Sequence, residues 1–481
     1  MTMEPLVRNA KQEARRHWPY YTAIAGVLII LLVLLTVFVT IPKPTSASHA
    51  LAGDWSTFLG GNGRPSYNGA ETAINPSTVG SLKQHWVLKT GVVGGKITTQ
   101  PVVANGILYW GSWDGYEHAS DATTGASIWT VPLGQSTDCR GEHLGVLSTA
   151  TVTSASIEGV IKTVVFVGGG NSTLYALNAS TGNILWQTHL GADANSFLYS
   201  SPAVYNGSVY IGVSGSADCS KSQGELVQVD ASTGNVQNTF TVVPTGCTGG
   251  SVWTAPTINE ATGMLYFSTS EKGSCSTGEK KVESLMQVRA TDLSLVGYWV
   301  VPAADMIFDG DFGATPTLFQ ATIGGVQHYM VGLPNKSGIF YAFDQSNVGA
   351  GPLWQVRLAT APGPSMASAG WDGTNLYVQS GPPTANSTTC PGILWSLNPN
   401  NGNAHWDTCL NFDARGGIMV VPGLIEVGLG QSMSIFDATN GTRLFNFTDS
   451  LNKSNFEGPG VIANGMLYHG NLDGRLYAFG P

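Results

Sequence analysis

The chain has 481 residues, of which only 11% are charged, and its formal net charge is −9. The acidic balance and the lack of a basic stripe argue against a nucleic-acid partner. The 61 glycines and the 10% of aromatic residues are typical of an all-β protein with short strands and tight turns. They also exclude a disordered chain, because disorder requires high charge and few aromatic residues.

The N-terminus carries a candidate membrane anchor. Residues 1–19 are polar and mildly basic, and an uncharged apolar run of 22 residues follows from Tyr20 to Ile41. A helix of that length can cross a bilayer, since it rises about 1.5 Å per residue. The basic flank predicts that the N-terminus stays in the cytoplasm. A cleaved signal peptide is the alternative, because Ser48-His49-Ala50 has the small-residue spacing of a cleavage site.

The apolar run is longer than a signal-peptide core, which favours a retained anchor. We therefore expect a single-pass protein of the cell membrane with an extracytoplasmic domain. The expected parts are a cytoplasmic segment at 1–19, a transmembrane helix at 20–41, a linker at 42–54 and one folded domain at 55–481.

One short motif recurs along the folded part. It begins with Asp or Asn, reaches Gly four residues later, and has an aromatic residue four positions after the Gly. Its copies are Asp121–Trp129, Asn178–Trp186, Asn398–Trp406 and Asp437–Phe445, and Asp230–Gly234 opens another. The Asp or Asn side chain accepts hydrogen bonds from its own turn, and Gly supplies a positive φ. The large aromatic face can then pack on a neighbouring unit.

The spacing of these turns is that of a propeller. Gly125 and Gly182 are 57 residues apart, and Gly182 and Gly234 are 52 apart, which is the period of a four-stranded blade with variable loops. With two degenerate copies, the chain has seven turns. The strand at 82–91 belongs to none of them, and the chain ends with an incomplete blade at 465–479. Pairing these two segments predicts an eight-bladed β-propeller without exposed sheet edges; seven blades is the alternative.

The pattern Ala-x-Thr-Gly-x-x-x-Trp resembles the tryptophan-docking motif of the quinoprotein, or PQQ-type, β-propellers. The resemblance covers residues 55–481. Three stretches look most like the polyvinyl-alcohol dehydrogenase branch: Ser201–Gly212, Asp309–Pro316 and Asn335–Ala342. For an enzyme, the resemblance implies PQQ on the central axis, stacked on a Trp, with Ca²⁺ and an Asp base beside it. Non-enzymatic propellers, including a bacterial outer-membrane assembly lipoprotein, share the repeat, so it implies the fold before it implies catalysis.

The resemblance also assigns candidate site residues. Trp253 matches the Trp that stacks on the cofactor. Lys336 and Arg140 match basic residues near the quinone, where a cation would stabilise the reduced cofactor's negative charge. Glu271 stands where the enzymes have a metal-ligating Asn, and Asp218 lies one position from a metal-ligating Glu. Carboxylate oxygens are suitable ligands for Ca²⁺.

Other positions depart from the enzymes. The catalytic Asp aligns with Arg289, which cannot act as a base and would repel a metal ion; Asp309 and Asp311 are the candidates for a displaced base. No Cys-x-x-Cys-His is present, so we expect no c-type haem. These departures favour a non-catalytic binding or scaffold protein of the cell surface, with a cell-envelope protein or carbohydrate as its partner. The alternative is a PQQ- and calcium-dependent alcohol or sugar dehydrogenase.

The sequence contains six cysteines. Their even number and the expected extracytoplasmic location favour disulfides, for which fifteen connectivities exist. We expect the pairs Cys219–Cys247 and Cys390–Cys409, because the partners are near in sequence. This leaves Cys139–Cys275 as the third pair.

Overall fold

The computed structural model describes residues 53–91, 94–191, 195–215, 222–274, 280–359, 365–383, 390–412, 415–451 and 453–481. The expected cytoplasmic segment at 1–19, the expected transmembrane helix at 20–41 and nearly all of the expected linker at 42–54 lie outside these residues. Within the described ranges, no helix is long and apolar enough to cross a membrane.

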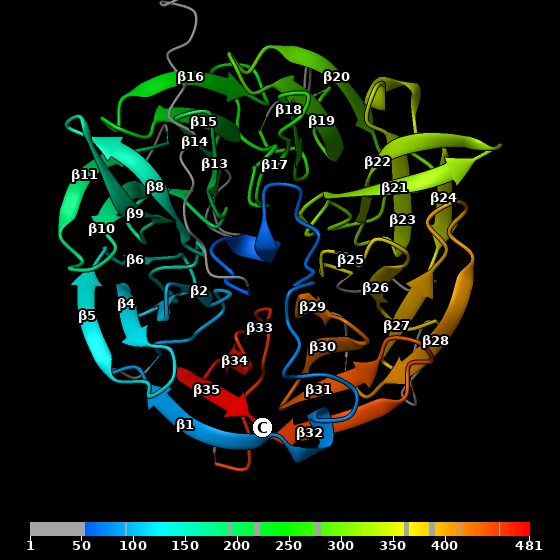
Figure 1. Ribbon diagram of the computed structural model, residues 1–481. Coiled ribbons are helices and arrows are strands. Elements are labelled where there is room, and N and C mark those ends of the chain that lie inside the picture. Colours follow the sequence, from blue (N-terminus) through cyan, green and yellow to red (C-terminus); the bar gives the residue numbers. More distant parts are fainter. Residues whose placement is uncertain are drawn as a thin grey trace, which may run out of the picture. The chain divides into compact units, whose positions relative to one another are not determined.

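Eight antiparallel sheets surround a central axis, as Figure 1 shows, so the predicted eight-bladed all-β propeller is confirmed. Each sheet, or blade, has four strands ordered from the axis outward. Blade 3 has a fifth, β12 (Ser196–Phe197), beside the end of β14. Alternating or continuous apolar runs form these strands, and their buried faces build the core between adjacent blades.

Blade 1 consists of β2 (Val102–Ala104), β3 (Ile107–Gly111), β4 (Tyr116–Asp121) and β5 (Ser127–Pro132), and blade 2 of β8 (Thr151–Ile157), β9 (Val160–Gly168), β10 (Thr173–Asn178) and β11 (Ile184–His189). Blade 3 consists of β13 (Ala203–Tyr205), β14 (Ser208–Gly215), β15 (Glu225–Asp230) and β16 (Val236–Thr241), and blade 4 of β17 (Thr257–Asn259), β18 (Met264–Ser268), β19 (Ser284–Arg289) and β20 (Leu295–Val300).

Blade 5 consists of β21 (Thr317–Ile323), β22 (Val326–Pro334), β23 (Ile339–Asp344) and β24 (Trp354–Arg357), and blade 6 of β25 (Gly370–Trp371), β26 (Leu376–Ser380), β27 (Gly392–Leu397) and β28 (Ala404–Leu410). Blade 7 consists of β29 (Ile418–Val421), β30 (Leu424–Leu429), β31 (Ser432–Asp437) and β32 (Arg443–Thr448), and blade 8 of β33 (Val461–Ala463), β34 (Met466–Gly470), β35 (Arg475–Gly480) and β1 (Lys83–Lys89). The smaller elements are the hairpin of β6 (Ser136–Thr137) and β7 (His143–Leu144) and three short helices, η1 (Phe58–Gly60), η2 (Val79–Ser81) and η3 (Val348–Ala350).

The ring is closed in blade 8 by strands from distant parts of the sequence. β1 pairs antiparallel with β35, and Trp86 stands opposite Ala478. The predicted pairing of the segment at 82–91 with the last blade is therefore confirmed, and the seven-bladed alternative is wrong. Each blade now has a neighbour on both sides, so no sheet face of the ring is left uncovered.

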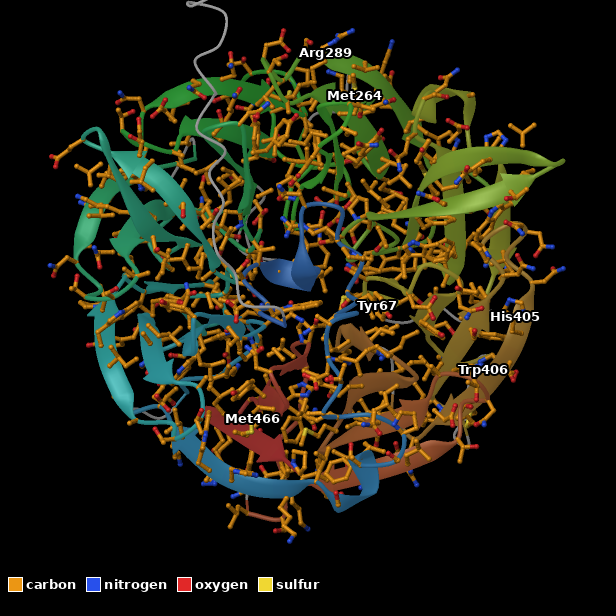
Figure 2. All side chains as sticks on the ribbon, in the orientation of Figure 1. Tyr67, Met264, Arg289, His405, Trp406 and Met466 are labelled. Atoms are coloured by element: carbon orange, nitrogen blue, oxygen red, sulfur yellow. A yellow bond between two sulfur atoms is a disulfide. The ribbon has the colours of Figure 1, made fainter. Side chains whose placement is uncertain are left out.

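The recurring Trp joins five of the eight blades to the next, as the motif predicts. Trp129 stands opposite the small residue Ala119, and its indole Nε1 donates a hydrogen bond of 2.9 Å to the Ala179 carbonyl of the following blade. The same kind of bond recurs around the ring, from Trp86 to Thr123, Trp186 to Ala231, Trp354 to Pro399 and Trp406 to Ala438. Figure 2 shows Trp406 on the outer part of its blade.

The segment Gly53–Asn68 occupies the centre of the ring, where Figure 1 shows it in dark blue. It hydrogen-bonds to the innermost strand of each blade in turn, through Val103, Val152, Val204, Ile258, Leu318, Trp371, Val420 and Ile462. Its Arg64 is fully buried and donates to the carbonyls of Phe58 and Pro256, at 2.6 and 3.1 Å. The segment thus contacts all eight blades and occupies the central axis where it makes these hydrogen bonds.

Candidate functional site

A cavity of about 240 Å³ lies among the loops of blades 3 to 5. The strands β14, β18 and β22 are equivalent in their blades, so the residues that end or follow them meet at the same end of the propeller. The connections that enter blades 3, 4 and 5 supply the rest of the lining. The lining residues are Tyr199, Ser214, Gly215, Ser251, Trp253, Ser270, Glu271, Asp309, Asp311 and Lys336.

Trp253, Asp311 and Lys336 form a connected group in this cavity. The indole Nε1 of Trp253 donates to Asp311 Oδ2 at 3.2 Å. The Lys336 ammonium lies 2.6 Å from Asp311 Oδ1, 2.7 Å from Asp309 Oδ1 and 5.3 Å from the centre of the Trp253 ring. The three side chains therefore fix one another's positions around a flat aromatic face.

The backbone explains why these side chains meet. Asn335 is fully buried, and its side-chain amide donates to the Gly310 carbonyl at 2.6 Å. The Lys336 amide donates to the Asp311 carbonyl at 3.2 Å. These bonds tie the turn after β22 to the loop before β21. Gly313 is required nearby, because a Cβ there would lie 2.9 Å from the Trp253 ring.

Three carboxylates converge beside Lys336. One oxygen each from Glu271, Asp309 and Asp311 lies within 4.8 Å of the other two. Burial raises the pKa of Asp311 to about 6; Lys336 opposes that rise, and the negative charges of Glu271 and Asp309 add to it. Burial favours a lower pKa for Lys336, but Asp311 and Asp309 outweigh it and the pKa is raised, so the ammonium stays charged.

The group fits both a metal ion and a flat quinone. Converging carboxylates that repel one another are stabilised by a divalent cation, and oxygen atoms are the ligands that Ca²⁺ prefers. The Trp253 face can stack on an aromatic ring. The hydroxyls of Ser214, Ser251 and Ser270 line the same cavity, and hydroxyls can pair with the polar edge of a ring.

The structure gathers five of the candidate residues in this one cavity: Trp253, Lys336, Glu271, Asp309 and Asp311. Arg140 is not among the lining residues. It lies in the turn between β6 and β7 and forms an ion pair with Asp138, at 3.0 Å from Nε to Oδ2. Asp218 lies outside the described residues, so its assignment stays a prediction.

Arg289 does not line this cavity, which corrects the sequence alignment of this residue with the catalytic Asp of the enzymes. It is the exposed last residue of β19, and Figure 2 shows it at the outer rim of the ring. Its guanidinium donates to Ser294 Oγ at 3.2 Å. The carboxylates of the cavity come from Glu271, Asp309 and Asp311.

Sequence reasoning missed Tyr199, Ser214, Ser251 and Ser270. The repeat contained a signal for two of them. Ser214 and Ser270 both lie at the end of the second strand of their blades, in β14 and just after β18, where Glu271 had already been noticed. Tyr199 and Ser251 lie in irregular connections, for which the repeat supplies no register.

The cysteine expectations have mixed outcomes. Cys390 and Cys409 are joined by a disulfide with Cα atoms 5.4 Å apart. Cys139 and Cys247 each take part in a disulfide as well. Cys219 and Cys275 lie outside the described residues, so the pairings Cys219–Cys247 and Cys139–Cys275 stay predictions.

Comparison with known proteins points to one family. The PQQ family model, described as the β-propeller domain of glucose, ethanol and alcohol dehydrogenases, matches residues 55–400. The polyvinylalcohol dehydrogenase of Sphingopyxis sp. (strain 113P3) is 26% identical over 479 residues, covering 84% of this chain and 70% of the relative. The polyvinylalcohol dehydrogenase of a Pseudomonas species is 23% identical over 469 residues, covering 84% of this chain and 71% of the relative. The crystal structure of quinohemoprotein alcohol dehydrogenase from Comamonas testosteroni matches with a TM-score of 0.72 at 16% identity, covering 92% of this chain and 82% of that one, and shows the same fold.

Proposed function

Since the chain belongs to the PQQ family of glucose, ethanol and alcohol dehydrogenase β-propellers, we propose that it is a dehydrogenase that oxidises an alcohol with PQQ and a divalent cation, first of all Ca²⁺. One observation carries the proposal: Lys336 and three carboxylates meet in a single cavity beside Trp253. Both relatives are named as dehydrogenases, which supports this function over a non-catalytic scaffold. The scaffold was favoured in the sequence analysis because several positions differ from those of the family's enzymes. A hydroxyl-rich polymer or a small alcohol is the corresponding substrate class.

PQQ, when bound, would supply the oxidant: it would accept from the alcohol carbon a hydride, which carries both electrons, and the cation would act as a Lewis acid. Trp253 would serve as the platform under the cofactor. Glu271 and Asp311 would hold the cation, because both offer carboxylate oxygens inside the cavity. Lys336 would keep a positive charge beside the platform, which stabilises negative charge that develops there.

Asp309 is the better placed of the two candidate bases. Its side chain is 57% exposed, whereas that of Asp311 is 3% exposed and bonded to Trp253. An alcohol arrives from solvent, so Asp309 can meet its hydroxyl and accept the proton. The ammonium of Lys336, 2.7 Å away, holds the Asp309 carboxylate in position.

A cofactor titration tests this assignment. PQQ is added to the purified protein with CaCl₂ while tryptophan fluorescence is recorded, and EDTA is then added in excess. We expect saturable quenching that EDTA reverses and that Trp253→Phe strongly reduces. Trp406→Phe is the matched control, because Trp406 docks on the neighbouring blade and its loss leaves the quenching intact. Absence of saturable quenching at tens of micromolar would reject the cofactor site.

The disulfides support the expected extracytoplasmic location of the propeller, because such bonds persist in oxidising compartments. The membrane anchor at 20–41 and the absence of haem remain predictions from the sequence. Protease digestion of intact cells tests the location: an extracytoplasmic propeller is cleaved without lysis, and a protected one contradicts the proposal.

A further inference from the structure

Blade 3 lacks the docking Trp that blades 1 and 2 contain. Trp129 stands opposite Ala119 in blade 1, and Trp186 stands opposite Ala176 in blade 2. At the same register position of blade 3, Asn238 stands opposite Gln228. A pair of amides therefore replaces the pair of a small residue and an indole.

The missing indole leaves an open space between blades 3 and 4. In blade 2, the Ala179 carbonyl accepts bonds from both Tyr109 and Trp129, at 3.2 and 2.9 Å. The equivalent Ala290 carbonyl of blade 4 accepts the Tyr bond, from Tyr210 at 2.6 Å. Where the indole would lie there is a cavity of about 370 Å³, lined by Tyr205, Asn206, Ser208, Tyr210, Gln228, Gln237, Asn238, Ala290 and Thr291.

Blade 4 shows what happens when such a space is filled. Its strand β20 has Gly297 at the Trp position, opposite Gln287. There η3 (Val348–Ala350) packs against β20, and Gln287 donates to the Gln345 carbonyl at 2.8 Å. Blade 3 has the same loss of Trp without such an insertion, so its space stays accessible from solvent beside the exposed Asn206 and Thr291.

The lining is polar, neutral and already ordered. None of the lining side chains is acidic, basic or a histidine. Gln228 Nε2 donates to Ser208 Oγ at 3.0 Å, and Asn238 Nδ2 donates to Gln228 Oε1 at 2.8 Å. Ser208 Oγ in turn donates to Gln237 Oε1 at 2.8 Å. Amides and hydroxyls both donate and accept, so this set suits a ligand with several hydroxyls and disfavours a metal ion or a phosphate.

We propose that this cavity between blades 3 and 4, at the position of the missing Trp, binds a neutral saccharide unit. Its volume is within the range of small-ligand sites. The half-buried ring of Tyr205 offers apolar surface for the C–H face of a sugar, and the amides of the exposed Gln237 and the half-buried Asn238 offer partners for its hydroxyls.

The saccharide site is separate from the candidate cofactor cavity. β14 contributes Ser208 to the saccharide site at one end and Ser214 to the cofactor cavity at the other. Six residues of strand separate these positions by about 20 Å. A saccharide can therefore occupy this site whether or not the protein is a dehydrogenase.

The double variant Gln228→Ala/Asn238→Trp provides the test, since it rebuilds the pair that Ala119 and Trp129 form in blade 1. Glucose, galactose, N-acetylglucosamine, cellobiose and xylobiose are titrated into the full-length protein, with saturation-transfer NMR and calorimetry as readouts. We expect at least one sugar to bind the parent protein saturably and to bind the double variant at least tenfold more weakly. The double variant should also melt at a higher temperature, because an indole fills the space.

A second variant keeps the test decisive if the double variant fails to fold. Asn238→Ala removes one amide without adding volume and should weaken binding severalfold while circular dichroism stays unchanged. Val160→Ala, at the exposed first residue of β9, serves as the matched control and should bind like the parent. The proposal is overturned if no sugar binds saturably, or if the sugars bind the folded variants as tightly as the parent.

Discussion

The ammonium of Lys336 lies 2.6 Å from the carboxylate of Asp311, inside the cavity that also holds Glu271 and Asp309. A cation that is part of the chain thus neutralises a buried acid at the point where the carboxylates converge. This pairing connects the affinity of the site for added cations to the charge of Lys336.

Lys336→Met should strengthen Ca²⁺ binding in the absence of PQQ. Lys336 competes with an added cation for Asp311, which it contacts at 2.6 Å, and a unit charge about 4 Å away is worth roughly 4 kcal/mol near a protein surface before salt screening. We expect a gain of at least about tenfold in Ca²⁺ affinity by calorimetry, which corresponds to about 1.4 kcal/mol and leaves room for screening. Lys96→Met, which removes an ion pair with Glu142 elsewhere in the chain, should have no effect. Unchanged or weaker Ca²⁺ binding by Lys336→Met would contradict a shared carboxylate site.

Ca²⁺ binding should depend on pH through Asp311. Burial raises the pKa of this carboxyl to about 6, so below pH 6 a proton occupies the group that the metal needs. Affinity should rise about tenfold per pH unit up to about pH 6 and level off above it. Asp311→Asn should bind more weakly and show a flatter profile. A flat profile between pH 5 and 7 in the parent protein would exclude Asp311 as a ligand.

Glu117→Gln should stabilise the propeller at neutral and alkaline pH. Glu117 is fully buried on β4, and no hydrogen-bond partner of its carboxyl oxygens is present among the described residues. Burial raises its pKa well above the ordinary value. A carboxyl whose pKa is raised by folding makes its full contribution to the free energy of unfolding below its unfolded-state pKa. That contribution is lost as pH rises through the folded-state pKa.

The difference between Glu117→Gln and the parent should therefore grow with pH. Urea unfolding at pH 5 and pH 8 measures it directly. Replacing the exposed Glu158 by Gln is the control, with a change expected within about 0.5 kcal/mol at both pH values. A Glu117→Gln protein that is less stable than the parent at pH 8 would mean that the carboxylate has a partner.

Trp129→Ala should cost about 3–5 kcal/mol of unfolding free energy, because the indole is buried between two blades and its Nε1 bonds to Ala179. Asn238→Ala alters the same register position of blade 3 and should cost less than about 1 kcal/mol, since no indole is lost there. Denaturant unfolding measures both. Equal losses would contradict the role assigned to the docking Trp.

The repeated motif predicted the blades and their closure because it depends on local chemistry. The turn Asn178–Gly182 sets its own geometry through short-range hydrogen bonds. Trp186, four residues later, indicates where the blade contacts the next one. The pairing of β1 with β35 could also be inferred, since one unpaired strand and one incomplete blade complete each other. The central segment Gly53–Asn68 could not, because its bonds to the blades come from an irregular chain.

The site was only partly predictable, since its loops differ in length from blade to blade. Alignment along the chain put Arg289 at the base position, yet β20 and a further loop separate it from Asp309. The tertiary bond from Asn335 to the Gly310 carbonyl brings the carboxylates to Lys336, and no local pattern encodes it. The absence of a Trp after Gly234 was visible in the sequence, but only the structure shows that the space at Asn238 stays open.

The most direct test of the proposed function is alcohol-dependent reduction of an artificial electron acceptor by the purified protein, with and without PQQ and CaCl₂. Vinyl-alcohol oligomers, ethanol and glucose are the substrates. The proposal predicts turnover of at least one of them only when both PQQ and Ca²⁺ are present. It also predicts a loss of at least about 100-fold in Asp309→Asn, with fluorescence quenching by PQQ retained. No cofactor-dependent turnover with any of these substrates, or full activity of Asp309→Asn, would contradict it.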